Sequence, residues 1–412
     1  MFMKKIKLKT PRRLLFLFMI MATILLVAYD KTVLENFTIK TVLGLIILVY
    51  ISNYLLNKIS SGDRYIFLII SMLFSIGLIM IYRINSYLGT KQLIWIVVGV
   101  IAFFITYIIM KKNKNWDKYI LLYIVAGYSL FFMTFLFGSA TKGAKNWINL
   151  GSISFQPAEL IKIILIFILA SYYSKKEKYD QYKYASLGLM GIVYSFLILL
   201  FLQRDLGMAV VFYGIFFCIQ YIYEDDRRLL FLNILLFLLG GLIGYNFFGH
   251  VKVRMQSWIN PWKYIERQGY QITQSLFAIA EGGFFGTGVG KGYPDFIPEV
   301  HTDFIFAAIC EEMGTLVGIG IIMLFLIFVY RGFKIGITQK DKFYRILALG
   351  ISISFGIQIF IILGGVLKMI PLTGITLPFI SYGGSSMLTS FIALGVLQRA
   401  SEDIDENGDK NG

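Results

Sequence analysis

Two pairs of charged residues lie inside apolar segments of the sequence, where a charge is costly unless it is paired or functional. Glu159 and Lys162 are three residues apart, so they share one face if their segment is a helix. Facing a water-filled cavity, they could supply a general base and a cation; otherwise they form a local ion pair. Glu311 and Glu312 are adjacent and point about 100° apart on a helix, so we expect one of them to pair with Lys or Arg.

Three polar stretches could carry chemistry as well, namely 139–155, 250–302 and 369–384. The longest, 250–302, contains a segment with Ile272, Leu276, Phe277 and Ile279 at helical spacing, opposite Gln271, Gln274 and Ser275. This pattern predicts an amphipathic helix at a membrane interface. Alternating glycines at 286–292 have no preceding strand and no Gly-Lys-Ser/Thr, which argues against a nucleotide site.

The composition is that of a polytopic helical membrane protein. Of the 412 residues, 57% are apolar and 15% charged, with 37 Phe and 26 Tyr, which excludes an ordinary soluble domain and a disordered chain. The only cysteines, Cys218 and Cys310, lie in apolar segments, and His250 and His301 are the only histidines. We therefore expect neither a disulfide framework nor a Cys/His zinc site.

Apolar runs predict about twelve membrane spans. They are 14–29, 41–56, 65–82, 92–110, 119–138, 156–173, 184–202, 207–223, 229–249, 303–330, 344–368 and 385–399. Only four residues separate 184–202 from 207–223, so one broken helix is an alternative there. The first run follows six basic residues and lacks a cleavage site, which indicates a retained anchor.

The distribution of basic residues predicts the orientation. With the N-terminus inside, the six inner segments hold 22 Lys and Arg in 57 residues, against 12 in 110 residues outside. This agrees with the positive-inside rule, and it accounts for the net charge of +15 without nucleic-acid binding. Both termini are then cytoplasmic, and the large loop 250–302 is extracellular.

Several motifs together resemble a known family, the SEDS proteins (shape, elongation, division and sporulation), represented by RodA, FtsW and SpoVE. The resemblance covers about residues 65–399. The motifs that carry it are Lys142-Gly143-Ala144 with Trp147, Gln156-Pro157 with Glu159 and Lys162, Asp205-Leu206-Gly207, Gly269-Tyr270-Gln271, His301-Thr302-Asp303 with Glu311-Glu312, and Ser381-Tyr382-Gly383-Gly384-Ser385.

The resemblance implies an all-α polytopic membrane protein with a SEDS core of ten helices at 65–399. Residues 1–64 would add a basic cytoplasmic N-terminus and two extra transmembrane helices. Residues 400–412 would form an acidic, disordered cytoplasmic tail.

The implied function is a peptidoglycan glycosyltransferase in the bacterial cytoplasmic membrane, serving elongation, division or sporulation. Such proteins polymerise lipid II at the outer face and work with a class B penicillin-binding protein. A carboxylate would deprotonate the acceptor hydroxyl, and cations would stabilise the departing undecaprenyl diphosphate. No cofactor or metal site is assigned, although a divalent cation, Mg²⁺ or Mn²⁺, would suit the diphosphate.

The resemblance also assigns site residues. The catalytic candidates are Glu266, Lys162 and Glu159. The substrate-binding candidates are Lys142, Trp147, Gln156, Asp205, Gln271, His301, Asp303, Ser381, Gly383 and Ser385.

The sequence departs from the family pattern at the position of its usual catalytic Asp, where an ungapped alignment places Tyr264. A phenol has a pKa of about 10 and is a poor base at neutral pH. Glu266, two residues on, or another loop acid, Asp295 or Glu299, could take that role. The alternatives are a scaffold that has lost its chemistry and regulates a penicillin-binding protein, and a transporter of lipid-linked precursors.

Overall fold

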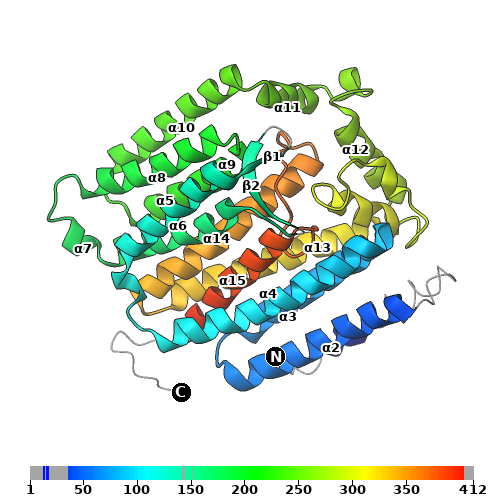
Figure 1. The fold of residues 1–412 in the computed structure, drawn as a ribbon, viewed down its shortest axis with the longest axis horizontal. Helices are drawn as coiled ribbons and strands as arrows, with labels where there is room; N and C mark the ends of the chain where they lie inside the picture. Colours follow the sequence, from blue (N-terminus) through cyan, green and yellow to red (C-terminus); the bar gives the residue numbers. More distant parts are fainter. Residues whose placement is uncertain (1–12, 14, 18–35, 142–143, 152, 403–412) are drawn as a thin grey trace, which may run out of the picture.

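The computed structural model describes residues 13, 15–17, 36–141, 144–151 and 153–402. Long helices lie side by side in one bundle, and α11 and α12 lie at the end opposite to α7 (Figure 1). The long helices are α2 (Asn36–Ile59), α3 (Arg64–Ile84), α4 (Ser86–Lys112), α5 (Ile120–Phe137), α6 (Pro157–Ser174), α8 (Ala185–Leu202), α9 (Leu206–Tyr223), α10 (Arg227–Phe247), α13 (Ile305–Thr338), α14 (Lys342–Val366) and α15 (Gly384–Ala400).

The short elements complete the described part of the chain. They are η2 (Trp116–Lys118), β1 (Ser139–Thr141), β2 (Ala144–Leu150), β3 (Ile153–Phe155), α7 (Lys176–Tyr179), α11 (Gly249–Ile259), η3 (Trp262–Tyr264), α12 (Tyr270–Gly282) and η4 (Pro294–Phe296). Most of them lie at the end of the bundle where α3, α5 and α8 finish. We call this the outer end, and the opposite end the inner end.

The predicted membrane-protein class is confirmed. Eleven of the twelve predicted runs are helices, and nine described helices are long and apolar enough to cross a membrane. The described apolar part of α2, Leu43–Ile59, and α15 are shorter, while the run 14–29 lies almost entirely outside the described residues. Residues 184–223 form two helices, so the alternative of one broken helix is wrong.

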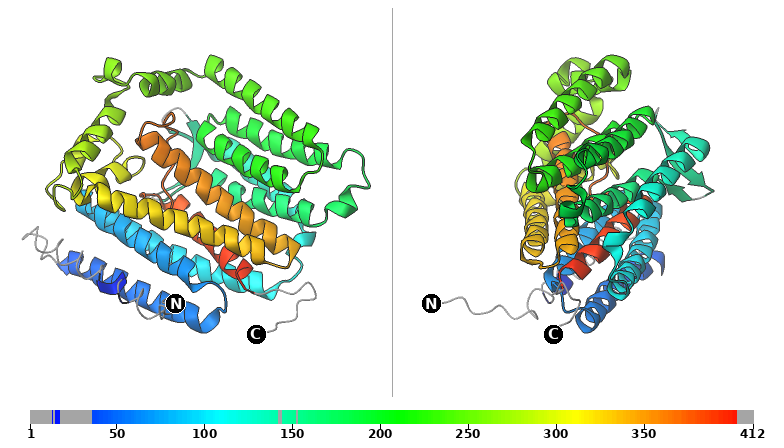
Figure 2. Two further views of the ribbon diagram at one scale, coloured as in Figure 1. Left: turned by 180° about the vertical axis from the view of Figure 1, so that it is seen from behind. Right: turned by 90° about the vertical axis from the view of Figure 1, so that its left-hand side faces the viewer.

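Burial separates central from peripheral helices. In α3, α6 and α14, 83% of the apolar window is buried, whereas in α10 only 17% is. Figure 2 shows α10 along one margin of the bundle, in agreement with this difference. Since a peripheral helix in a bilayer can expose apolar side chains to lipid, the exposed Leu and Phe of α10 fit a membrane environment.

Three short strands form a small antiparallel sheet that was not expected from the sequence, where 139–155 is only a polar loop. The order is β1-β2-β3, and Ile148 pairs with Phe155. Ile148 is buried and the next residue, Asn149, is exposed, as the alternation of side chains along a strand requires. The sheet connects α5 to α6 at the outer end.

The long helix α13 is broken at Gly314, where φ is 85° and ψ is 161°. The backbone N–H groups of Thr315 and Leu316 bond instead to the carbonyls of Gly283 and Phe284, at 3.0 and 3.2 Å. The loop after α12 therefore replaces the missing helical hydrogen bonds of α13. This satisfies backbone groups that have no water partner in a membrane.

The predicted amphipathic helix exists as α12, but the predicted division of its faces is wrong in part. Ser275 and Thr273 are buried, whereas Phe277 is 47% exposed. The cause is close packing on α13, since a Cβ at Gly282 would lie 2.1 Å from the carbonyl oxygen of Cys310. Small residues permit this approach, and the hydroxyl groups bond to carbonyls of their own helix.

We expect Gly314→Ala to lower the free energy of unfolding by about 2–4 kcal/mol, because φ is positive and a Cβ would meet the carbonyl oxygen of Phe284 at 2.4 Å. The measurement is thermal unfolding of the detergent-solubilised protein. Gly320→Ala is the matched control, since nothing lies within 4 Å of a Cβ at Gly320 in the same helix. Equal effects of the two substitutions would contradict the role of the break.

Candidate functional site

The predicted site residues lie on several elements that meet at the outer end of the bundle. Their arrangement is built around Asp205, which caps the first turn of α9 by accepting the N–H of Met208 at 3.2 Å. Its other carboxylate oxygen accepts the side-chain amides of Asn146 at 2.7 Å and Gln156 at 2.8 Å. Asp205 thus joins β2, the start of α6 and the start of α9, and it caps α9, as its position just before the apolar run 207–223 predicts.

Burial has the largest effect on the pKa of Asp205. Its removal from solvent raises the pKa of the carboxyl group, while the three hydrogen-bond donors act in the opposite direction. All three donors are N–H groups, so they hold the carboxylate in a fixed orientation. Asn146 contributes a neutral amide to this group, so Asp205 has no cationic hydrogen-bond partner among the three donors.

The segment between α14 and α15 is irregular, and the part from Ile375 to Ser381 is mostly buried. Its predicted residues Ser381, Gly383 and Ser385 all make specific contacts. The hydroxyl of Ser381 accepts the N–H of Leu377 and donates to the carbonyl of Thr302, at 2.9 and 2.5 Å. Ser385 accepts the N–H of Gln156 at 3.0 Å. These contacts attach the segment to α6 and to the residues just before α13.

Contacts with two further residues, His301 and Gln92, complete the attachment. The N–H of Tyr382 donates to the carbonyl of His301 at 2.8 Å, and the two rings pack against each other. Gln92 in α4 donates to the carbonyl of Ser381 at 3.1 Å and accepts the N–H of Gly383 at 3.4 Å. Gln92 is fully buried, and nothing in its sequence context indicates this role.

Glu159 and Lys162 form a buried ion pair of 2.7 Å in the first turns of α6. The ammonium group also donates to Gln358 of α14 at 2.8 Å, and Gln358 donates to the carbonyl of Thr376 at 3.0 Å. Gln358 was not identified from the sequence. Since the pair is buried and Lys162 bonds to both Glu159 and Gln358, its geometry is that of a local ion pair with a structural role.

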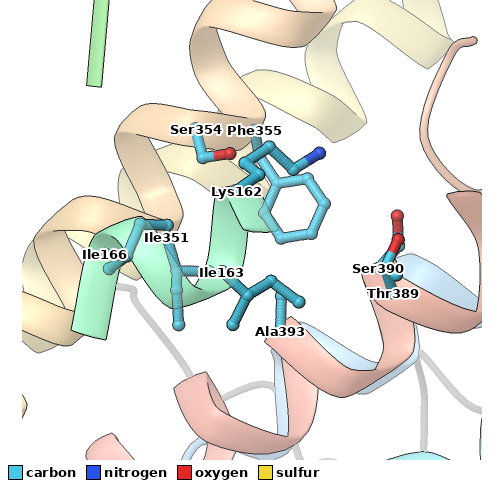
Figure 3. A pocket seen from close by; sticks show the side chains of 9 residues that line it. All are labelled: Lys162, Ile163, Ile166, Ile351, Ser354, Phe355, Thr389, Ser390 and Ala393. Carbon is cyan, nitrogen blue, oxygen red and sulfur yellow. The ribbon is translucent and has the colours of Figure 1, made fainter. Parts of the chain in front are cut away.

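A small cavity adjoins Lys162, between α6, α14 and α15 (Figure 3). It is lined mainly by apolar side chains together with Ser354, Thr389 and Ser390. It has room for about one water molecule. A cavity of this size cannot admit a sugar, so it does not place Lys162 against a substrate.

The two adjacent carboxylates of α13 have separate partners, as expected. Glu312 forms an ion pair with Arg83 of α3 at 2.9 Å and accepts the N–H of Gly290 at 2.9 Å. Glu311 accepts the N–H of Tyr293 at 2.7 Å. Both carboxylates therefore hold the glycine-containing loop after α12 against α13, which is a structural role.

Arg254 of α11 is a cation at the outer end that sequence reasoning missed. Its guanidinium group donates to the carbonyl of Thr373 at 2.7 Å. A Cβ built on Gly374 would lie 3.1 Å from the guanidinium of Arg254 and 3.6 Å from the carboxylate of Asp303. Burial lowers the pKa of Arg254, and the charges of Asp303 and Asp205 oppose that shift. The negative charges of two predicted site residues, Asp303 and Asp205, therefore act on Arg254.

Other predicted residues are not brought into this group. Glu266 is exposed between η3 and α12 and makes no hydrogen bond or ion pair with the described residues. Tyr264 is half-buried, in η3. Gln271 lies in the first turn of α12 and Trp147 in β2, both half-buried, and Lys142 lies outside the described residues.

Within the described ranges, no three His, Cys, Asp or Glu residues form a group that could hold a metal ion. Arg254 and the neighbouring helix ends are the features here that suit an anionic group.

We expect Lys162→Met to cost about 3–5 kcal/mol of stability, because it leaves Glu159 buried without a counter-charge. The double variant Glu159→Gln with Lys162→Met should recover much of that loss. Unfolding midpoints in detergent would measure both effects. If the double variant were no more stable than the single one, the ion pair would not be the reason for the loss.

Three comparisons identify relatives of the chain. The cell cycle protein family of FtsW, RodA and SpoVE matches residues 63–406. The peptidoglycan glycosyltransferase RodA of Mycobacterium tuberculosis is 37% identical over 360 residues, covering 81% of this chain and 76% of that one. Stage V sporulation protein E of Bacillus subtilis is 34% identical over 361 residues, with 84% and 98% covered.

Solved structures show the same fold. A chain of a peptidoglycan synthase complex aligns with a TM-score of 0.69 at 22% identity, covering 82% of this chain and 97% of that chain. A mutant of the rod shape determining protein RodA of Thermus thermophilus aligns with a TM-score of 0.60 at 23% identity, with 82% and 97% covered. The chain is a multi-pass membrane protein that belongs to the FtsW, RodA and SpoVE family of peptidoglycan glycosyltransferases.

Proposed function

We propose that this chain polymerises lipid II into glycan strands at the outer face of the cytoplasmic membrane. The observation that carries the proposal is the convergence of Arg254, Asp303 and Asp205 at the outer end of the bundle. Lipid II offers a diphosphate at the membrane surface and sugars outside it. A half-buried cation at this end of the bundle suits such a diphosphate.

The reaction needs one proton acceptor and one group that stabilises the leaving diphosphate. The acceptor hydroxyl attacks the anomeric carbon of the donor, its proton passes to a carboxylate, and the bond from that carbon to the diphosphate breaks. The diphosphate leaves with the bonding electrons, so a single displacement inverts the anomeric centre. We assign Arg254 to the leaving diphosphate and Glu266 to the proton.

Glu266 suits the role of base because it is exposed and has no competing partner among the described residues. Tyr264 carries a phenol, which is a poorer base than a carboxylate at neutral pH. The buried pair Glu159 and Lys162 then supports the site by fixing α6 against α14.

The proposal also includes the orientation of the chain in the membrane and a protein partner. Basic residues concentrate at the inner end, which supports a cytoplasmic inner end and cytoplasmic termini. A class B penicillin-binding protein would supply the transpeptidase, and the similarity to a chain of a peptidoglycan synthase complex supports such a partner.

We expect Arg254→Gln to slow polymerisation of labelled lipid II by about 100-fold or more, because one charge-stabilising donor is lost. The assay resolves glycan ladders made by the purified protein, with and without its penicillin-binding protein. Arg267→Gln, an exposed arginine of the same outer segment, is the control and should leave the rate nearly unchanged. Equal rates for both variants would remove Arg254 from the mechanism.

We expect Glu266→Gln to slow the same reaction by about 100-fold to 10,000-fold, as for the loss of a general base. Glu281→Gln is the matched control, since Glu281 is exposed on α12. An unchanged rate would exclude Glu266 as the base and direct attention to Asp295 and Glu299.

The absence of ladders from the wild-type protein with its partner bound would favour the scaffold, which Tyr264 suggests. Movement of lipid II across sealed vesicles without polymerisation would favour the transporter.

A further inference from the structure

The inner end of the bundle contains a second, larger pocket that the proposed chemistry does not use. It is formed by the first residues of α3, the last turns of α13 and the residue that follows α15. The residues that line it are Gly62, Asp63, Arg64, Tyr65, Arg331, Lys334, Ile335, Thr338 and Ser401. Figure 1 shows the start of α3 and the end of α13 at the same end of the bundle.

The pocket has an excess of positive charge. Its single carboxylate, Asp63, is engaged by Arg331 at 2.7 Å and caps α3 by accepting the N–H of Tyr65 at 2.9 Å. Arg331 is fixed further by stacking over the ring of Tyr65, 4.6 Å from its centroid. The side chains of Arg64 and Lys334 are exposed and make no hydrogen bond or ion pair with the described residues. Two cations are therefore available to a ligand.

The N-terminal end of α3 adds to the positive charge of the pocket. Asp63 occupies the N–H of Tyr65, but the helix as a whole directs the positive end of its dipole toward the pocket. An oxyanion with several acceptor oxygens, such as a phosphate ester, matches two free cations beside a helix start.

The surroundings of the pocket indicate a lipid as the ligand. Met323, Ile327, Tyr330, Lys334 and Ile337 follow one another at spacings of four and three residues, so they form one stripe along α13. The four apolar members of this stripe are exposed, by 51%, 43%, 65% and 74%. Lys334 therefore lies in a row of side chains that faces acyl chains in a bilayer.

We propose that this pocket binds the headgroup of an anionic phospholipid of the cytoplasmic leaflet. Arg64 and Lys334 contact its phosphate, and the exposed stripe of α13 receives its acyl chains. Basic pockets between helices on the cytoplasmic side are suited to anionic headgroups. The site is independent of the sugar chemistry at the outer end.

The test is native mass spectrometry of the detergent-solubilised full chain titrated with dioleoyl phosphatidylglycerol and, separately, with dioleoyl phosphatidylcholine. We expect tighter binding of phosphatidylglycerol. Each basic residue near a membrane surface contributes about fivefold, so Arg64→Gln with Lys334→Gln should weaken phosphatidylglycerol binding about 25-fold. The Asp63–Arg331 pair stays intact in this variant.

Lys178→Gln with Arg228→Gln is the matched control, because it removes the same two charges from exposed positions elsewhere at the inner end. It should change binding by less than about twofold. The single variant Lys334→Gln, at an exposed position, should still show about fivefold weaker binding if the double variant proves unstable.

Three results would overturn the proposal. The first is equal affinity of the wild-type protein for the two lipids, or an equal loss in the control. The second is displacement of phosphatidylglycerol by glycerol phosphate at a similar concentration, which would indicate a soluble phosphate ligand. The third is binding that occurs only after removal of residues 403–412, whose acidic sequence begins two residues after Ser401, since the pocket would then belong to that segment.

Discussion

A backbone group inside a membrane protein must find its hydrogen-bond partner within the protein, and the outer end of this bundle is arranged around that constraint. The irregular segment before α15 meets it through side chains of distant elements: Gln92 and Gln358 donate to its carbonyls, and Gln92 also accepts the N–H of Gly383. The break in α13 meets it through the loop after α12. The polar motifs of the chain therefore stabilise the fold itself, apart from any contact with a substrate.

This constraint separates two kinds of charged residue. Glu159, Lys162 and Glu312 are buried and have short contacts with specific partners, so a change of protonation would break the contacts that hold the helices. Arg254 and Glu266 differ from them. Arg254 is bonded to one carbonyl at the edge of the irregular segment, and Glu266 is exposed. Groups of the second kind can accept a proton or meet an anion without dismantling the bundle.

The sequence predicts much of this arrangement, because the strongest signals in it are local. Apolar runs predict the spans, and the spacing of Glu159 and Lys162 predicts a shared face. Asp205 before an apolar run predicts a helix cap. The motifs of the family resemblance select most of the residues at the outer end, since each motif includes groups with a specific backbone partner.

The remaining features depend on contacts between residues far apart in the sequence. Gln358 is one polar residue in an apolar helix, and only the position of Lys162 gives it a role. Arg254 becomes relevant because Asp303 and Thr373 lie beside it. The faces of α12 were misjudged because tight packing at Gly282 favours small polar residues over large apolar ones.

Helices α3 and α13 are joined by an ion pair at each end of the bundle, Arg331 with Asp63 at 2.7 Å and Arg83 with Glu312 at 2.9 Å. A displacement of one helix along the other would break both pairs, so the two helices act as one rigid unit. The outer pair holds the loop after α12, which follows the segment of Tyr264 and Glu266. The base proposed on that segment, Glu266, is exposed, so a sugar hydroxyl can approach it while the loop after α12 stays anchored.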